Sequence, residues 1–221
     1  HLLRLTELKS WRTIERPDMA IKLHKGDLPD GLDFGRSVAV DTETLGLNPH
    51  RDKLCLVQLS SGDGNAHLVQ LDRDEYNAPN LSALMANPEV EKIFHFARFD
   101  IAVMKKYLDV DVAPVYCTKI ASKLVRTYTD RHGLKDLVRE MLGIEMSKQQ
   151  QSSDWGTPVL SDAQKQYAAL DVIYLHELKA RFDKMLRREG REELARNCFD
   201  FLATRTHLDL LGWSEDDIFA H

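Results

Sequence analysis

Short apolar runs dominate the first half of the chain and predict the strands of a mixed sheet. Three of these runs follow one another from Val38 onward, and a Ser-Gly-Asp-Gly-Asn turn lets the third pair back on the second. Two further apolar runs are each adjacent in sequence to a segment with helical periodicity. The five expected strands cover residues 38–40, 54–59, 66–71, 92–96 and 112–115.

Helical periodicity fills the spaces between the later strands and most of the chain after the last of them. One helix is expected near residues 81–86 and another over residues 98–108. Ser161 and Gln164 form a capping box that opens a long helix toward Arg187. Strands that come first as a group and are then interleaved with helices indicate an α/β fold of the ribonuclease H-like class. We expect a mixed five-stranded sheet flanked by helices, with a C-terminal helical extension.

The two ends of the chain stand apart from this expected domain, which covers residues 20–188. Residues 1–19 do not begin with Met, and we interpret them as an upstream extension or a remnant of recombinant expression, with a native helical arm as the alternative. Residues 189–221 form the expected C-terminal extension and tail, packing on the domain or on a neighbouring subunit. The tail near residues 208–219 is unusually apolar for a terminus, which favours a contact surface on its own subunit or on a second one.

Composition argues against a membrane-embedded protein. The chain has 221 residues, of which 43% are hydrophobic and 29% charged, as in one globular domain with a sizeable core. No run approaches the ~18 apolar residues of a membrane span, and no signal peptide is visible. Cys55, Cys117 and Cys198 are far apart and form no C-x-x-C pair, so we expect free buried thiols in a reducing cytoplasm rather than a redox or zinc site.

Acidic residues follow the apolar runs in three separate segments. Asp41 and Glu43 come directly after the first strand, where side chains two residues apart point to the same face, about 7 Å apart. Asp100 falls in the first turn of the helix that follows the fourth strand. Tyr167 and Asp171 stand four residues apart and therefore share one face of the long helix.

Together these segments predict a divalent-cation site of Asp41, Glu43, Asp100 and Asp171, because like-charged carboxylates on one face repel each other until a cation binds. Hard oxygen ligands of this kind suit Mg²⁺ or Mn²⁺. Each segment also has an ordinary interpretation: a solvated turn, an acid favoured by the helix dipole, or a packing pair. Their joint occurrence in this order favours the metal site over the three separate explanations.

The five residues Asp41, Glu43, Asp100, Tyr167 and Asp171 resemble the motifs of the DEDDy 3′→5′ exonucleases, the ribonuclease D-like branch of the DnaQ superfamily. The string KQQQSSDW resembles a stretch of ribonuclease D. Strings such as DTETLGL, TYTDRHGLK, SKQQQSSDW and LDLLGWSE are similar to the nano-RNase C family of short oligoribonucleases. The likeness covers about residues 20–221 and lacks no motif. It makes the expected fold a DnaQ-type exonuclease domain.

The resemblance implies a metal-dependent 3′→5′ exoribonuclease that cleaves very short RNAs, dinucleotides above all, to nucleoside 5′-monophosphates. Two divalent cations would bind the scissile phosphate. Asp41, Glu43 and Asp171 would hold the cation that helps deprotonate the attacking water, and Asp41 with Asp100 the cation that stabilises the leaving oxygen. Tyr167 would orient the water by its hydroxyl. A homo-oligomer, in the form of an octameric ring, is also implied.

Residues next to the acidic segments are candidates for holding the RNA. Leu45 would wedge between bases and Gly46 would permit close backbone approach, with an ordinary turn as the alternative. His95 would reach the 3′ hydroxyl or only satisfy the core. Phe96 or Phe99 would stack on bases of any sequence, with core packing as the alternative for at least one of them.

A basic stripe of Lys119, Lys123 and Arg126 recurs on one helical face and suits a 5′ phosphate, with a solvated face as the alternative. Trp155 is interpreted as a structural anchor or as a stacking ring. The full candidate set for substrate binding is Thr42, Leu45, Gly46, His95, Phe96, Phe99, Lys119, Lys123, Arg126, Gln151, Ser153 and Trp155.

A formal net charge of −5 fits a short substrate held by a few local contacts, because long duplexes usually require a basic footprint. Two alternatives stay open: a broader 3′ exonuclease that trims structured RNA ends or acts on DNA, and a noncatalytic nucleic-acid-binding module. The roughly 35 residues after the long helix disfavour the extra domains of ribonuclease D. Intact acids at all four positions disfavour the noncatalytic module.

Overall fold

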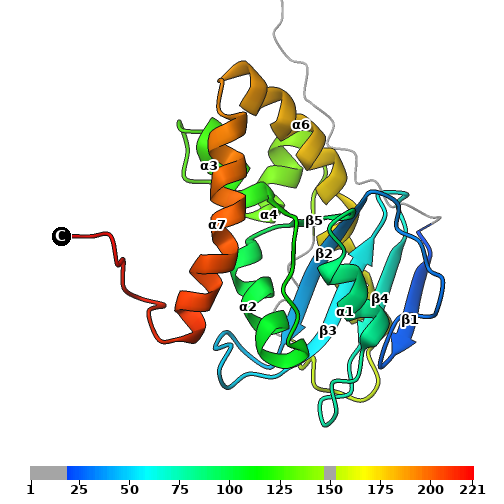
Figure 1. Cartoon of the computed structure of the whole chain (residues 1–221). Coiled ribbons are helices and arrows are strands. Elements are labelled where there is room, and N and C mark those ends of the chain that lie inside the picture. The colour runs from blue at the N-terminus through cyan, green and yellow to red at the C-terminus, as the bar shows by residue number, and fades with distance from the viewer. Residues whose placement is uncertain (1–18, 147–152) are drawn as a thin grey trace, which may run out of the picture.

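A six-stranded mixed sheet forms the centre of the molecule (Figure 1). The computed structural model describes residues 19–146 and 153–221. The strand order is β1-β4-β3-β2-β5-β6, in which β3 runs antiparallel to both of its neighbours and the other pairs are parallel. The strands are β1 Ile21–Lys25, β2 Ser37–Thr44, β3 Leu54–Ser60, β4 Ala66–Gln70, β5 Glu91–Phe94 and β6 Val115–Cys117.

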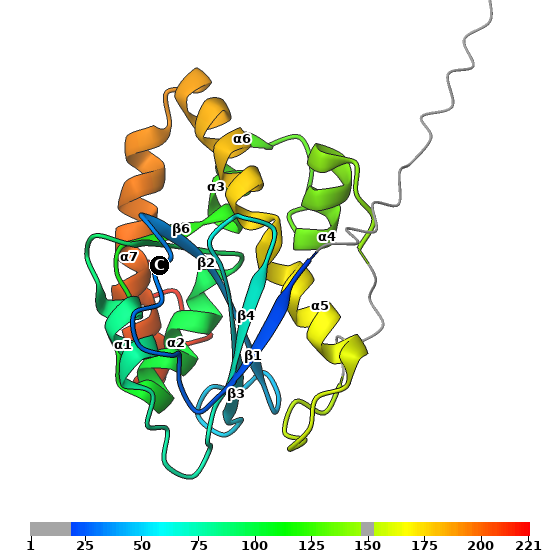
Figure 2. The same ribbon diagram turned by 90° about the vertical axis from the view of Figure 1, so that its right-hand side faces the viewer.

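Helices cover both faces of this sheet and make a three-layer α/β domain (Figure 2). Helices α1 and α2 lie on one face and α5 on the other, while α7 packs along α2 and α3. The helical elements are α1 Pro79–Ala86, α2 Ala97–Leu108, α3 Thr118–Val125, α4 Leu134–Leu137, a π-helical turn η1 Val138–Leu142, α5 Asp162–Ile173, α6 Leu175–Arg188 and α7 Glu192–Leu210. The predicted α/β fold class is therefore confirmed.

The prediction of five strands was wrong by one, because β1 escaped it. This edge strand pairs only with β4, and its side chains are exposed or half-buried, so it carries no apolar face to mark it. The last strand begins three residues later than expected. Val112 is buried in the core without pairing, and Pro114, which has no N–H, contributes only its carbonyl to Lys92 N at 2.9 Å.

The long helix expected from Ser161 to Arg187 is divided at Tyr174. The capping box that opens it is present: the Ser161 hydroxyl accepts from Gln164 N, and the Gln164 side chain accepts from Ser161 N. Backbone angles of φ −98° and ψ −7° at Tyr174 turn the chain, so that α5 stays on the sheet while α6 packs against α3. The division holds α5 over β2, β3 and β4, where its polar face carries the chemistry described below.

The C-terminal segment after α7 is exposed and runs away from the domain (Figure 1). Its root is fixed by Asp209, which accepts 2.6 Å and 2.7 Å hydrogen bonds from the Arg98 guanidinium, and by the Ser214 carbonyl, which accepts from the same group at 2.8 Å. Trp213 and Phe219 keep much of their surface exposed. Within residues 19–146 and 153–221, none of the helices has the length and apolar content needed to cross a membrane.

The three cysteines form no disulfide. Cys55 and Cys117 are buried, as expected, whereas Cys198 is only half-buried. Burial raises the pKa of the Cys55 thiol to about 11, so this thiol is protonated and unreactive at neutral pH.

Candidate active site

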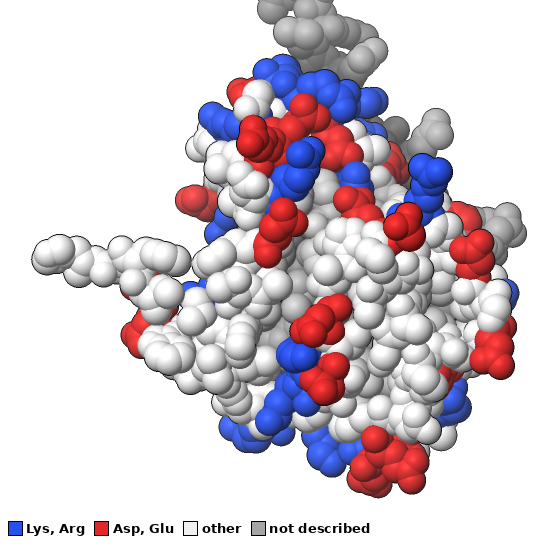
Figure 3. All heavy atoms as spheres, in the orientation of Figure 1, with Lys and Arg blue, Asp and Glu red and all other residues white. Residues whose placement is uncertain are grey.

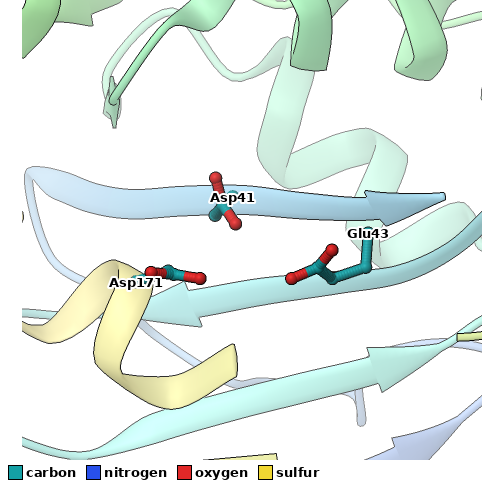
Figure 4. A group of neighbouring side chains, drawn as sticks. All are labelled: Asp41, Glu43 and Asp171. Carbon is teal, nitrogen blue, oxygen red and sulfur yellow. The ribbon is translucent and has the colours of Figure 1, made fainter. Parts of the chain in front are cut away.

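Asp41, Glu43 and Asp171 point toward one another from β2 and α5 (Figure 4). One carboxylate oxygen of each lies within 4.8 Å of the other two. The two β2 residues share a face because they are two positions apart in a strand, and α5 crosses that face. The fold thus places three acids from two distant segments at one point.

Asp100 approaches the same group from α2, on the other side of β2. It is buried, and its Oδ1 accepts a 2.6 Å hydrogen bond from the Thr42 hydroxyl. Phe96, with a left-handed φ of 69°, turns the chain sharply from β5 into α2, which places Asp100 in the first helical turn. Asp100 does not belong to the three acids whose oxygens lie within 4.8 Å of one another, but its charge acts on Asp41.

Burial raises the pKa of all four carboxyl groups, and repulsion from neighbouring carboxylates adds to the rise for Asp41, Glu43 and Asp100. Burial raises the pKa of Glu43 to about 9, with Asp171 and Asp100 adding to the rise. It raises the pKa of Asp100 and of Asp171 to about 7, and that of Asp41 well above its ordinary value. A cluster of this kind is unfavourable as four bare anions, and close hard oxygens that repel each other fit a divalent cation such as Mg²⁺ or Mn²⁺.

Tyr167 stands one helical turn before Asp171, and the two side chains are hydrogen-bonded. Burial, followed by the charges of Asp171, Glu43 and Asp41, raises the pKa of the phenol, so its hydroxyl keeps its proton at neutral pH. The Trp155 ring supports the Tyr167 ring at a centroid distance of 6.1 Å. This arrangement gives the site a fixed hydrogen-bond donor beside its carboxylates.

Two residues of the site were missed by sequence reasoning. Gln58 has no exposed surface, and its Nε2 donates a 3.2 Å hydrogen bond to Asp41 Oδ2 across the β2–β3 pair. Its signal was a glutamine inside an otherwise apolar strand, Leu-Cys-Leu-Val-Gln-Leu-Ser. Lys135, on α4, places its Nζ 5.2 Å from the centre of the Tyr167 ring. It ends the family-like string TYTDRHGLK, but no pattern there gave it a role.

The loop after β2 carries Leu45 and Gly46. Leu45 is half-exposed, and its Cδ2 lies so close to Gly156 that a Cβ there would come within 2.7 Å of it. A Cβ at Gly46 would come within 2.3 Å of Asp52 Oδ2, so glycine is required there for the approach of the Asp52 side chain that caps the loop. Thr42, a further substrate candidate, uses its hydroxyl on Asp100 instead.

The residues around Asp100 divide between surface and core. His95 Nδ1 and the Thr118 hydroxyl are hydrogen-bonded at 2.9 Å, and burial lowers the pKa of His95 to about 3, so the imidazole is neutral. Phe99 packs against the core, whereas Phe96 is largely exposed and lies under Lys119 Nζ at 4.2 Å from its ring centre. Of the two rings, Phe96 therefore keeps more exposed surface, part of which Lys119 covers.

The basic stripe predicted on α3 does not exist as a single face, and Arg126 does not belong to it. The helix ends at Val125, and the buried Arg126 guanidinium pairs with Glu140 and donates to the Arg131 carbonyl at 2.7 Å. Both interpretations of Arg126, as a contact for the 5′ phosphate and as part of a solvated face, therefore disagree with its burial. Lys119 and Lys123 instead line a mostly apolar cavity of about 620 Å³ between α3 and α7, together with Phe96, Arg98, Cys117, Ile120, Asn197, Cys198, Phe201, Leu202 and Arg205.

The loop before α5 supports the site from behind. Trp155 is buried against Leu56, Leu68 and neighbouring apolar side chains, as a structural anchor would be. Ser153 is half-buried beside it along the chain. Gln151 lies outside the described residues.

Comparison with known proteins gives the family. A family model described as 3′-5′ exonuclease matches residues 20–187. Ribonuclease D of Acidiphilium cryptum (strain JF-5) is 34% identical over 154 residues, which cover 70% of this chain and 39% of that protein. The chain thus spans about two fifths of the length of the ribonuclease D relatives it matches.

Solved structures extend the likeness to nearly the whole chain. Brucella melitensis NrnC bound to pGG is 55% identical with a TM-score of 0.89, over 92% of this chain and 99% of that one. Brucella melitensis NrnC with bound Mg²⁺ is 53% identical with a TM-score of 0.88, over 92% of this chain and 100% of that one.

Proposed function

Since this chain belongs to the 3′-5′ exonuclease family, we propose that it hydrolyses RNA from a free 3′ end with the help of two divalent cations. Its preferred substrates are very short RNAs, dinucleotides above all, and its products are nucleoside 5′-monophosphates. One observation carries this proposal: Asp41, Glu43 and Asp171 converge from β2 and α5 with carboxylate oxygens within 4.8 Å of one another, and the charge of the buried Asp100 on α2 acts on Asp41.

The donor set fits Mg²⁺ or Mn²⁺, because it consists of carboxylate oxygens that repel one another when no cation is bound. Asp41, Glu43 and Asp171 would hold one cation, and Asp41 with Asp100 the other. Bound there, the cations would lower the pKa of a water molecule and offset the charge on the phosphate. The Mg²⁺-bound NrnC structure supports magnesium as one of the ions.

The chain's own residues position the reactants. The Tyr167 hydroxyl donates its proton to the Asp171 carboxylate, which fixes its direction and leaves the phenol oxygen to accept a hydrogen bond from the attacking water. Thr42 and Gln58 hold the Asp100 and Asp41 carboxylates in place by direct hydrogen bonds. The neutral His95 is a hydrogen-bond partner for the 3′ hydroxyl of the terminal nucleotide.

A short substrate is favoured by the net charge of the chain and by a relative. The formal net charge is −5, whereas a long nucleic acid usually requires a basic footprint. Figure 3 shows acidic and basic side chains interspersed on one face of the molecule. Leu45 and the exposed Phe96 ring provide apolar contacts for two bases rather than many. The NrnC structure bound to pGG supports the same preference.

A homo-oligomer is part of this proposal, with the C-terminal tail as one contact. Trp213, Ile218 and Phe219 are exposed apolar side chains after α7, and only the Phe219 ring lies near an aromatic ring of its own domain, at 6.1 Å from Phe201 among the described residues. Residues 215–217 are acidic, and the apolar cavity between α3 and α7 is rimmed by Lys119 and Lys123. Opposite charge and exposed apolar surface on both sides favour docking of the tail on another copy. The free thiols agree with a reducing cytoplasm.

The test is a product analysis with the full chain. RNA labelled at its 5′ end and RNA blocked at its 3′ end are incubated with Mn²⁺, Mg²⁺ or a chelator, and products are separated by chromatography. We expect metal-dependent release of nucleoside 5′-monophosphates from the open 3′ end only. Asp41→Asn should abolish the reaction, and Asp200→Asn, which changes an exposed acid on α7, should leave it intact. Cleavage of the blocked RNA, or activity in chelator, would contradict the proposal.

A further inference from the structure

Lys135 occupies an unusual place for a lysine. It belongs to α4, a helix of only four residues that lies on the same side of the sheet as α5 (Figure 2). Leu137, two positions on, is fully buried and fixes this helix against the core. The Lys135 Nζ is itself buried and lies 5.2 Å from the centre of the Tyr167 ring. The fold therefore directs this ammonium inward, to the residue that precedes Asp171 by one turn.

The charge of Lys135 reaches the carboxylate group. Burial raises the pKa of Asp171, and the Lys135 ammonium opposes that rise. Two arginines elsewhere in the helical layer have acidic partners of their own: Arg126 pairs with Glu140, and Arg98 pairs with Asp209. A buried ammonium is costly unless anionic partners surround it, so its position indicates a role in the local charge balance.

The charge balance changes when cations and substrate enter. Four carboxylates and two divalent cations sum to zero, whereas the scissile phosphate brings one negative charge and gains more as the reaction proceeds. Cations bound at the carboxylates would neutralise them. The ammonium that the fold holds beside Tyr167 would then act on the charge of the phosphate.

We infer that the Lys135 ammonium contacts a nonbridging oxygen of the scissile phosphate and stabilises the charge that builds on it. This inference rests on the proposed function. In the reaction, the water oxygen forms a bond to phosphorus and the bond from phosphorus to the 3′ oxygen breaks. A proton lost by the water is balanced by the proton that the released 3′ hydroxyl gains. Lys135 keeps all of its protons and serves as a fixed positive charge.

The test compares Lys135→Met, which keeps the length of the side chain, with Lys135→Arg, which keeps the charge. Lys184→Met is the matched control, because Lys184 is exposed on α6 away from the site. The kcat and KM for a dinucleotide are measured with the full chain at saturating Mn²⁺, and the Mn²⁺ concentration for half-maximal activity is measured for each variant. The melting temperature of each variant checks the fold.

We expect kcat to fall about 100-fold in Lys135→Met, in line with the loss of one charge-stabilising donor, and to recover in part in Lys135→Arg. Because Lys135→Met removes a positive charge near Asp171, it should leave the Mn²⁺ concentration for half-maximal activity unchanged or lower it. A dinucleotide with sulfur at the contacted nonbridging position should slow the wild type more than Lys135→Met. If the sulfur substitution slows the wild type and Lys135→Met by the same factor for both phosphorothioate diastereomers, the two effects are additive and Lys135 does not contact the phosphate.

Two other outcomes would also overturn it: a kcat of Lys135→Met within threefold of the wild type, or a loss that disappears at higher Mn²⁺, which indicates a role in the cation site. An inactive wild type would instead refute the proposed function. If Lys135→Met does not fold, the rate loss caused by sulfur is measured in Lys135→Arg instead. The guanidinium is displaced from the position of the ammonium, so this rate loss should differ from that of the wild type for one diastereomer only.

Discussion

The Thr42 hydroxyl donates a 2.6 Å hydrogen bond to Asp100 Oδ1. Thr42 lies between the two β2 carboxylates in sequence and faces the opposite side of the strand, where α2 brings Asp100. Thr42 of β2 thus holds the side chain of Asp100, which belongs to α2. This contact sets the position of Asp100, which would hold the second cation together with Asp41.

Thr42→Val should lower activity about tenfold to 100-fold and raise the Mn²⁺ concentration needed for half-maximal activity. Valine keeps the shape of threonine but leaves Asp100 without its donor, and partners that orient metal-binding carboxylates have effects of this size. Activity is measured against Mn²⁺ concentration, with Thr127→Val as an exposed control. An unchanged metal requirement would show that Asp100 does not depend on Thr42.

Tyr167→Phe should reduce kcat by about tenfold to 100-fold and leave KM within about twofold. Phenylalanine keeps the packing on Trp155 and loses only the hydroxyl that is bonded to Asp171. Because burial and the nearby acids raise the pKa of the phenol, the wild-type group acts as a protonated orienter. Steady-state kinetics on a dinucleotide provide the measurement, and an unchanged kcat would remove Tyr167 from the reaction.

The metal-free protein should become less stable as pH rises through the neutral range, because of its raised carboxyl pKa values. Glu43 has a folded pKa of about 9 against about 4.3 in the unfolded chain, so the folded state holds more protons between these values. Its contribution to the free energy of unfolding is complete below the unfolded pKa and is lost as pH rises toward the folded pKa. Histidines with lowered pKa values oppose this trend only below their unfolded pKa of about 6.5.

Glu43→Gln isolates this contribution. Over one and a half pH units the difference between Glu43→Gln and the wild type should grow by about 2 kcal/mol, which corresponds to about 4–8 °C in melting temperature. The melting temperatures of both proteins are measured in chelator at pH 6.5 and pH 8. Relative to the wild type, the melting temperature of Glu43→Gln should be higher at pH 8 than at pH 6.5. A difference that does not depend on pH would mean that Glu43 has an ordinary pKa.

Deleting the chain from Trp213 onward should lower the mass of the particle in solution. The truncation removes the exposed Trp213, Ile218 and Phe219 and leaves Asp209 with its partners Arg98 and Arg205. The mass is measured by light scattering after size-exclusion chromatography. A second variant, in which residues 215–217 are replaced by neutral amides, separates the effect of charge from that of apolar contact. An unchanged mass in both variants would mean that the tail contacts only its own subunit.

Sequence patterns predicted those elements in which local and tertiary preferences agree. β2 and β3 have continuous apolar runs because they lie in the middle of the sheet and are buried on both faces, and α2 follows from its helical period. β1 has no such run because an edge strand buries little. The division at Tyr174 depends on which neighbours α5 and α6 find, which no local pattern records.

The acids of the site were predictable because their spacing is tied to strand and helix geometry. Asp41 and Glu43 share a face by strand alternation, and Tyr167 and Asp171 by the helical repeat. Arg126 was misplaced because the helical period was extended one residue past the end of α3, where a buried ion pair with Glu140 takes over. Lys135 was invisible because its partner Tyr167 is far away in sequence.

The most direct measurement is cleavage of 5′-labelled RNAs of two, seven and twenty nucleotides under identical conditions, with Mn²⁺, with Mg²⁺ and with chelator. The proposed function predicts metal-dependent hydrolysis that is fastest on the dinucleotide and absent in Asp41→Asn. Equal or faster processing of the twenty-nucleotide RNA would contradict the preference for short substrates and indicate general 3′ trimming. No cleavage of any RNA would contradict the catalytic role itself.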